Sequence, residues 1–296
     1  MLRSISPCGS KVAMTSIPGV ADPAYLRGAQ YKDSKNLNAR IELHRRFSTN
    51  PVTWSRWAFD QLLVLLDRSS DRPQRLLELG AGAGTLWAAN YRRIPRHWKI
   101  VLSDFSSGML ADANRAIPAP AGTFDLLLAD AHDIPFEALS FDAVIANHML
   151  YHVANRPKAL REIQRVLHPD GVLLASTIGN RHLREIDEWL RRFGVDQRYW
   201  GVAATQAFSL ENGRDQLAAV FDHVEERRYE DSLRVTEVEP VIAYILSMRA
   251  GSQLPENATA QLRHELEAQI AAHGALHITK DSGLFVASAK ALPPAT

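Results

Sequence analysis

Three glycines at alternate positions carry the first chemical signal in this sequence. They follow a short apolar run, Leu76–Leu79, and occupy positions Gly80, Gly82 and Gly84 before a stretch that can open a helix at Thr85. Glycine is needed where a backbone bends sharply or where a ligand lies against it, and the first N–H groups of a helix can donate to that ligand. This stretch therefore predicts a strand, a tight turn and a helix N-terminus that cradle a small molecule.

The glycine spacing narrows the choice of ligand. A dinucleotide fingerprint requires Gly or Ala at the sixth position of G-x-G-x-x-G/A, and that position is Thr85 here. The Gly-Lys-Ser/Thr of a phosphate-binding loop does not occur. What remains is the pattern Glu78-x-Gly80-x-Gly82-x-Gly84. A glycine-rich turn without a ligand stays an alternative until other motifs supply a context.

Acidic residues end the next two predicted strands. Asp104 follows the strand Lys99–Ser103, at the carboxyl end where a carboxylate can accept two hydrogen bonds from a ribose diol. Asp130 follows the strand Phe124–Leu128. From its surroundings alone, Asp130 is equally well explained as a turn residue or a helix cap.

The candidate general bases follow a fourth apolar strand, Phe141–Asn147. They are His148, Tyr151 and His152. The two histidines lie four residues apart and would share one face of a helix, but no Glu follows the first and no third ligand is evident, so we expect no metal site. A histidine pKa near neutrality suits proton removal. The alternative that these side chains only satisfy local hydrogen bonds remains equally open.

The remaining elements are arranged to position these residues. Two amphipathic helices, Ser34–Phe47 and one that begins at Trp54, precede the glycine loop. Strands and helices then alternate, which predicts a parallel sheet covered on both faces. The last third holds strands at Val224–Tyr229 and Leu284–Ala289, with a helix of about Glu256–His273 between them. In an insertion at 179–208, the aromatic residues Trp189, Phe193, Tyr199 and Trp200 belong either to a substrate cap or to a satellite core.

Composition limits the partners. The chain has 34 Lys and Arg against 33 Asp and Glu, a net charge of +1, which disfavours a nucleic-acid or anionic-membrane surface. Its one cysteine, Cys8, excludes an internal disulfide and fits a reducing cytosol. No apolar run approaches the ~20 residues that span a bilayer. We expect a cytoplasmic protein that binds neither nucleic acid nor membranes.

Together these motifs resemble bacterial class I S-adenosylmethionine (SAM) dependent methyltransferases that act on small molecules. The Asn-His-Met-Leu-Tyr-His segment at 147–152, the Asn-Leu-Asn-Ala-Arg helix at 36–40 and the Leu-x-Pro-x-Gly turn at 167–171 extend the resemblance from about Gln30 to the end. It implies an α/β, Rossmann-like seven-stranded sheet, mostly parallel with the last strand antiparallel. It also implies an N-terminal helical lid at 21–72 and a SAM-binding domain at 73–296 with helical cap insertions near 179–208 and 231–280. The alternative that the N-terminal helices only pack against the sheet stays open. From the sequence itself we expect a disordered tail at 1–20.

The resemblance also implies which residues contact SAM. Tyr31, Arg40 and His44 are weaker candidates, as residues of the lid, and Phe105 and Met109 would lie near the adenine. Asp130 and Ala131 would contact the adenine edge. The other expected SAM contacts are Glu78, Gly80, Ala81, Gly82, Asp104 and Asn147. The implied reaction is an in-line displacement that moves the methyl group to a small-molecule acceptor, with His148, Tyr151 or His152 as base if the acceptor is protonated.

Other functions stay open at this stage. The chain can bind SAM and use it for another displacement or for an intramolecular cyclisation, or it can be a non-catalytic SAM-binding subunit. An NAD-dependent oxidoreductase is disfavoured by Thr85 and by the combined motifs. The sequence leaves open which acceptor is used, whether O, N, C or S is methylated, and whether the chain is a monomer or a homodimer.

Overall fold

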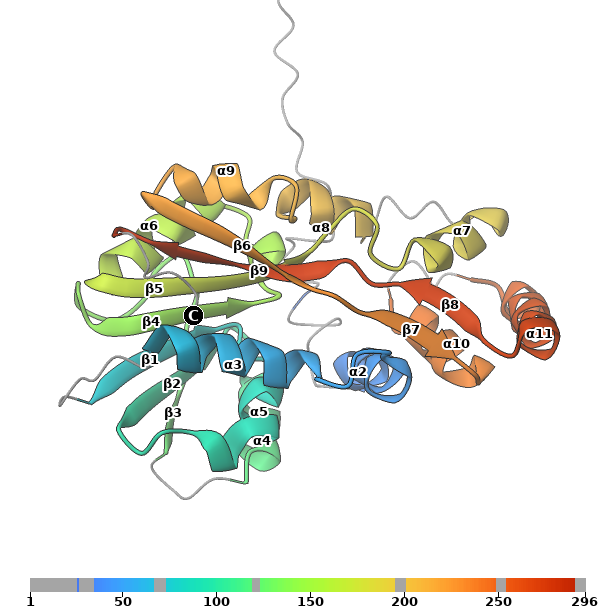
Figure 1. The fold of residues 1–296 in the computed structure, drawn as a ribbon, viewed down its shortest axis with the longest axis horizontal. Helices are drawn as coiled ribbons and strands as arrows, with labels where there is room; N and C mark the ends of the chain where they lie inside the picture. Colours follow the sequence, from blue (N-terminus) through green and yellow to red (C-terminus); the bar gives the residue numbers. More distant parts are fainter. Residues whose placement is uncertain are drawn as a thin grey trace, which may run out of the picture.

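The computed structural model describes residues 26, 35–66, 73–118, 123–194, 201–248 and 254–290. Its centre is a seven-stranded sheet with the order β3-β2-β1-β4-β5-β9-β6 (Figure 1). Strands β1 to β5 pair in parallel, and β9 is antiparallel to both of its neighbours. This is the predicted sheet, and the predicted fold class is confirmed. The strands are β1 (Gln74–Leu79), β2 (Trp98–Asp104), β3 (Phe124–Leu128), β4 (Phe141–Asn147), β5 (Leu167–Ile178), β6 (His223–Tyr229) and β9 (Ser282–Ser288).

Helices cover both faces of the sheet because alternate side chains of each buried strand point to opposite faces. One face packs Leu76, Ile145 and Val286 against α3 (Trp54–Leu66) and α4 (Thr85–Asn90), with α5 (Ser107–Ala116) beside α4. The other packs Val144 and Phe285 against three further helices. These helices are α6 (Arg156–Val166), α8 (Gly201–Ala207) and α9 (Gly213–Ala218). A short 3-10 turn, η2 (Tyr91–Arg93), follows α4, and another, η3 (Leu150–His152), follows β4.

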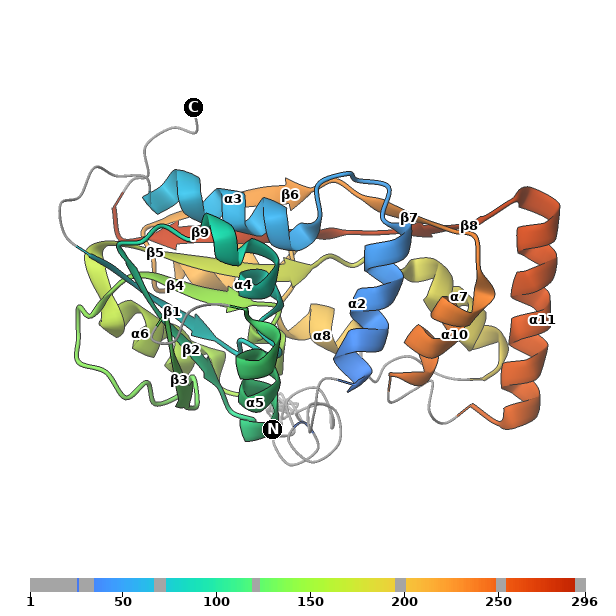
Figure 2. The ribbon, with the colours of Figure 1, turned by 90° about the horizontal axis from the view of Figure 1, so that it is seen from below.

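A cap extends from one end of the sheet. Strands β7 (Ser232–Val235) and β8 (Leu276–Thr279) form an antiparallel pair that continues β6 and β9 beyond the sheet (Figure 2). These two four-residue strands are not predicted by the sequence pattern. The cap also holds α2 (Lys35–Phe47), α7 (Arg184–Arg192), α10 (Val238–Leu246) and α11 (Glu256–His273), the last with the expected bounds.

The cap has a hydrophobic core of its own. Buried side chains from α2, α7, α10 and α11 meet those of β7 and β8, so segments from both ends of the chain share one cluster. Trp189 is buried there and Phe193 packs against it, as the satellite-core alternative predicted. Tyr199 and Trp200 lie outside the described residues. The cluster includes Leu43, Phe47, Ile186, Leu190, Leu233, Val241, Ile245, Leu262, Leu266 and Ile278.

The two N-terminal helices belong to different parts of the molecule. Helix α2 contacts α10 and β7 in the cap, whereas α3 packs on the sheet against α4. The proposed tail at 1–20 and most of the residues before α2 fall outside the described part of the chain. Strand β5 begins at Leu167 rather than at the expected Val172, because its pairing with β4 shifts register near Phe141 and carries the turn residues within the strand. None of the described helices has the length and hydrophobicity needed to cross a bilayer.

Candidate active site

The glycine loop has the backbone shape that its sequence predicted. Gly80, Gly82 and Gly84 have φ values of 65°, 56° and 68°, a region that residues with a Cβ rarely adopt. A Cβ at Gly80 would lie 2.9 Å from Met149 Cβ, and a Cβ at Gly84 would lie 2.7 Å from Ile117 Cδ1. The loop therefore packs directly against the segment that follows β4 and against the end of α5. Its second residue, Ala81, donates its N–H to the Ser103 carbonyl at 2.9 Å, which ties the loop to β2.

Asp104 links the loop to the neighbouring strand. It ends β2 with only 4% of its surface exposed, and its Oδ2 accepts the Gly82 N–H at 2.9 Å. Its Oδ1 accepts the Ser106 N–H at 2.8 Å, beside the Ser106 hydroxyl that caps α5. Burial raises the pKa of this carboxyl, against the backbone hydrogen bonds that lower it. Asp104 is thus held at the carboxyl end of β2, against the backbone of the glycine loop.

Glu78 is a second acidic group below the loop. It is 1% exposed, and its Oε2 accepts the Trp87 indole N–H at 2.5 Å. Burial and the nearby Asp104 carboxylate together raise the pKa of Glu78 to about 8, against the Trp87 hydrogen bond, which lowers it. Its carbonyl oxygen accepts the Ser103 hydroxyl at 3.0 Å. Two carboxyl groups therefore flank the glycine loop, and the inner one favours its protonated form at neutral pH.

The residues expected near an adenine differ in their exposure to solvent. Phe105 is partly exposed directly after Asp104, whereas Met109, in the first turn of α5, is 1% exposed. Asp130 is exposed, and its Oδ1 accepts the His132 N–H at 2.9 Å, which closes a turn. This is the turn role that the sequence left open for it. Ala131 behind it is buried.

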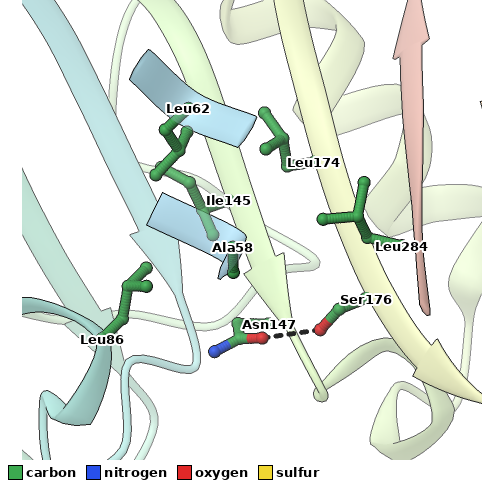
Figure 3. A pocket seen from close by; sticks show the side chains of 8 residues that line it. All are labelled: Ala58, Leu62, Leu86, Ile145, Asn147, Leu174, Ser176 and Leu284. Atoms are coloured by element: carbon green, nitrogen blue, oxygen red, sulfur yellow. Dashed lines mark hydrogen bonds between the residues drawn. The ribbon is translucent and has the colours of Figure 1, made fainter. Parts of the chain in front are cut away.

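Asn147 ends β4 beside the loop. Its side-chain oxygen accepts hydrogen bonds from the Ser176 hydroxyl at 2.6 Å and from the Trp54 indole N–H at 3.3 Å. Figure 3 shows Asn147 and Ser176 together at one side of an apolar cavity of about 10 Å³, room for about one water. The cavity is too small for a substrate. Its other lining residues are Ala58, Leu62, Leu86, Ile145, Leu174 and Leu284.

His148 has an unusual backbone. Its φ is 54°, which is uncommon for a residue other than glycine and marks local strain of the kind that gathers at functional sites. Its N–H donates to the Ser176 hydroxyl at 2.9 Å, and its ring centroid lies 4.9 Å from that of Trp54. Burial and the Lys280 ammonium lower the pKa of His148 to about 4. The imidazole is therefore uncharged at neutral pH.

The other two candidate bases lie elsewhere. Tyr151 is 5% exposed and belongs to the core beneath α6 and α8, and the His152 ring packs on it at 4.6 Å between centroids. Because the helical turn η3 begins only at Leu150, His148 and His152 do not share a helix face. No group of three or more His, Cys, Asp or Glu side chains in the described ranges is arranged to hold a metal ion.

The structure adds basic and aromatic residues that the motifs did not predict. His182 follows β5, and Lys280 lies between β8 and β9, where it pairs with Asp231 and lies 5.1 Å from the Tyr229 ring centroid. His44, expected only as a lid residue, lies 6.1 Å from His182 between ring centroids. No sequence spacing relates these positions, which come together through the cap. Arg40, the other lid candidate, instead donates to the Ser247 carbonyl at 2.8 Å and ties α2 to α10.

Comparison with known proteins agrees with this geometry. Residues 77–175 match the methyltransferase domain family. Malonyl-[acyl-carrier protein] O-methyltransferase of Halorhodospira halophila is 34% identical over 130 residues, which are 43% of this chain and 42% of that protein. The chain therefore spans less than half the length of this curated relative.

Solved structures share the fold. Phosphoethanolamine N-methyltransferase 2 of Haemonchus contortus, bound to S-adenosylhomocysteine, has a TM-score of 0.55 at 20% identity and covers 91% of this chain and 60% of its own. The [4+2]-cyclase SpnF has a TM-score of 0.55 at 19% identity, and the match covers 93% of this chain and 98% of the cyclase. Residues 77–175 are thus similar to a methyltransferase domain, and the sheet has the fold of class I methyltransferases, as the resemblance predicted.

Proposed function

We propose that this chain is a SAM-dependent methyltransferase that acts on a small-molecule acceptor. The observation that carries the proposal is the hydrogen bond between the Asp104 carboxylate and the Gly82 N–H, at the carboxyl ends of β1 and β2. It brings a diol-binding carboxylate against a glycine loop, which is where open α/β sheets bind nucleoside ligands. The domain match and the bound S-adenosylhomocysteine of the Haemonchus neighbour support SAM as that ligand.

The residues of the cradle fit this cofactor. Gly80 lets the loop turn tightly against Met149, Gly82 has no Cβ to obstruct a ligand at the loop backbone, and Asp104 would accept the ribose hydroxyls. Glu78, whose pKa is about 8 without a ligand, would ionise as a cationic group approaches. When bound, SAM supplies a methyl group that its positively charged sulfur already activates. Contacts from Tyr31, Phe105, Met109, Asp130, Ala131 and Asn147 remain predictions.

His148 is the candidate base that the fold brings closest to the cradle. The next residue, Met149, contacts Gly80, and the His148 imidazole is uncharged because burial lowers its pKa. An uncharged imidazole can orient an acceptor through a hydrogen bond and accept its proton, but a pKa of about 4 makes His148 a weaker base than the near-neutral histidine that the sequence predicted. Orientation alone can lower the barrier by roughly 7–11 kcal/mol, so a base is needed only when the acceptor arrives protonated.

We test the cofactor assignment by calorimetric and thermal-shift titration with SAM, S-adenosylhomocysteine and NAD. The first two should bind and NAD should not, and a ligand at a hundred times its dissociation constant should stabilise the fold by about 2.7 kcal/mol. Binding of NAD alone, or of none of the three, would contradict the proposal.

Single replacements test the base. We expect His148→Gln to lower kcat with little change in SAM affinity, because the imidazole acts on the acceptor. The kcat and SAM affinity of Tyr151→Phe and His152→Gln are measured in the same way. The control is His97→Gln, which changes an exposed histidine just before β2. Full turnover in all three candidate variants would exclude a general-base role for this segment.

One neighbour favours a second candidate function. The [4+2]-cyclase covers nearly the whole chain, so this fold also serves a reaction other than methyl transfer. Methyl transfer releases S-adenosylhomocysteine in equal amount to product. Product formed without S-adenosylhomocysteine would favour the cyclisation alternative. We further propose a cytoplasmic enzyme without a nucleic-acid or membrane partner, supported by its balanced charge.

A further inference from the structure

Four basic side chains from distant segments gather where the sheet meets the cap. They are His44 of α2, His148 after β4, His182 after β5 and Lys280 between β8 and β9. The His44 ring lies 6.1 Å from that of His182 and 5.9 Å, edge-on, from that of Tyr244. Burial lowers the pKa of all three imidazoles, and the Lys280 ammonium lowers it further, so three uncharged rings share the surroundings of one cation.

This basic cluster adjoins the cofactor cradle. Met149, which follows His148, contacts Gly80 directly. On the other side, a Cβ built on Gly82 would lie 3.5 Å from Leu37 Cδ2, so α2 runs from the glycine loop to the cluster at His44. A group held by the basic cluster is therefore next to a ligand held by the loop, which is the relation an acceptor requires.

The cluster has hydrogen-bonding capacity that the described protein groups leave unused. The Nδ1 atom of His44 is buried without a hydrogen-bond partner among them. The Lys280 ammonium carries three N–H donors, and the described structure supplies one acceptor, the Asp231 carboxylate. Because the His182 Nδ1 accepts the Asp281 N–H at 3.2 Å, the neutral ring carries its proton on Nε2, as a donor. Donors of this kind suit an oxygen anion.

The two acidic groups beside the cluster are already engaged. Asp231 has a fully buried side chain, and it accepts the Ser48 hydroxyl at 2.5 Å together with the N–H groups of Thr49 (3.1 Å), Asn50 (3.0 Å) and Ser232 (2.8 Å). Asp281 pairs with Arg228 at 2.7 Å and Arg181 at 3.6 Å. A cationic acceptor would thus meet Lys280 with neither carboxylate available to it.

We infer that this basic cluster is the acceptor site and that it selects acceptors whose nucleophile is an anionic oxygen, such as a phenolate or a carboxylate. The inference rests on the proposed function, because it assigns the second substrate of the same site. Lys280 would stabilise the oxygen anion, and His44 and His182 would orient it.

The reaction balances with the groups present. An acceptor that arrives as O–H gives its proton to the His148 imidazole as the O–H bond breaks, and a carboxylate or phenolate needs no such transfer. The acceptor oxygen forms a bond to the methyl carbon while the carbon–sulfur bond breaks. The electron pair of the broken carbon–sulfur bond stays on sulfur, so the sulfonium charge is lost and a neutral thioether leaves.

Three small probes test this acceptor class on the full chain saturated with S-adenosylhomocysteine: benzoate, benzylamine and 4-nitrophenol. We expect benzoate to bind more tightly than benzylamine, measured by calorimetry. We expect bound 4-nitrophenol to be more ionised than the free probe at the same pH, which its absorbance reports. In Lys280→Met, benzoate should bind about ten- to 150-fold more weakly, and the ionisation shift should vanish.

The controls separate this inference from stability and from the cofactor. Lys290→Met removes an exposed lysine that pairs with Asp170, and should leave benzoate binding unchanged. If Lys280→Met does not fold because Asp231 is left unpaired, the double variant with Asp231→Asn removes both charges. Any of three results overturns the inference: benzylamine binds more tightly than benzoate, benzoate binds the Lys280 variants as well as the parent, or no anion binds. Failure of S-adenosylhomocysteine to bind instead rejects the proposed function, and benzoate is then titrated into the chain alone.

Discussion

At the level of single residues, Asp104 links the fold to the expected ligand. Its carboxylate satisfies the N–H groups of Gly82 and Ser106 and is almost fully buried. A side chain this buried keeps a polar group only where hydrogen bonds compensate for its lost hydration. The same two oxygens are those that a ribose diol would contact, so the residue is poised for a ligand before one arrives.

Replacement of Asp104 tests this role. We expect Asp104→Ala to weaken SAM binding about ten- to 150-fold, because hydrogen bonds to a charged group are worth about 1.5–3 kcal/mol. The matched control is Asp142→Ala, which removes a buried carboxylate that accepts the Arg75 N–H at 2.8 Å near the opposite end of β4. Calorimetry on both folded variants makes the comparison. Equal SAM affinity in the Asp104 variant and the parent would place the cofactor elsewhere.

Candidate residues differ in how well the sequence predicted them. Glu78, Gly80, Gly82 and Asp104 follow directly from strand ends, where local pattern and the geometry of a parallel sheet agree. The zinc-type spacing of the two histidines carried no structural meaning, because the segment is not an α-helix. His182 and Lys280 could not be predicted, because their neighbours are set by long-range packing.

At the level of elements, the glycine loop combines two constraints. Gly80 needs a left-handed backbone and also lies against Met149, whereas Gly274, which ends α11 with a φ of 78°, has no atom within 4 Å of an added Cβ. A substitution at Gly274 therefore reports the effect of backbone strain alone, whereas one at Gly80 reports backbone strain together with close packing. Only the first lies beside the cradle.

Alanine at each position tests this separation. Gly274→Ala should lower the free energy of unfolding by about 1–2 kcal/mol, the cost of a left-handed residue with a Cβ. Gly80→Ala should lower it by a further 1–3 kcal/mol or so, because Met149 must move, and should also weaken SAM binding. Urea unfolding and calorimetry measure the two effects. Equal losses of stability, with SAM affinity intact, would show that close packing at Gly80 has no role.

Strands β7 and β8 show the limit of element prediction. Each has four residues, too few for a clear alternation, and they lie some forty residues apart. Helix α11, in contrast, was predicted with its observed bounds, because eighteen residues with apolar positions four apart form a strong local signal. The length and the periodicity of α11 made it predictable, and β7 and β8 have neither.

At the level of the whole molecule, the basic cluster lies between two hydrophobic cores. One core belongs to the sheet and one to the cap. The chain passes between them from β6 to β7 and from β8 to β9, while the strands themselves pair as β6 with β9 and β7 with β8. His44 comes from the cap side, His148 and His182 from the ends of sheet strands, and Lys280 from the connection itself. Any change in how the cap sits on the sheet would move these groups relative to one another.

The buried histidines predict a pH dependence of stability. The pKa values of His148 and His182 are lowered to about 4 and about 3 by burial and by Lys280, with Asp231 and Asp281 facing the same cluster. A lowered folded-state pKa means that the unfolded chain binds more protons, so this contribution is present above the ordinary value of 6.5 and is lost as the pH falls toward 3–4. Stability from these residues should fall with acidification.

The comparison uses His182→Gln against the parent, with His97→Gln as control. Between pH 7 and pH 4 the fall in melting temperature should be smaller in the His182 variant, measured by thermal unfolding in buffers of constant ionic strength. Glu78 and Asp187, with pKa values raised to about 8 and about 6, act in the opposite direction, so the difference between variants is the relevant quantity. Parallel pH profiles for the parent and both variants would contradict the assignment.

The sequence by itself determined the sheet, the glycine loop and the acidic residues beside it. These depend on interactions within short stretches and on the rule that parallel strands present their carboxyl ends at one edge. Only the tertiary structure decided which residues surround the acceptor position. His44, His148, His182 and Lys280 come from four segments that the packing of the cap brings together, and burial in that packing keeps the three imidazoles uncharged at neutral pH.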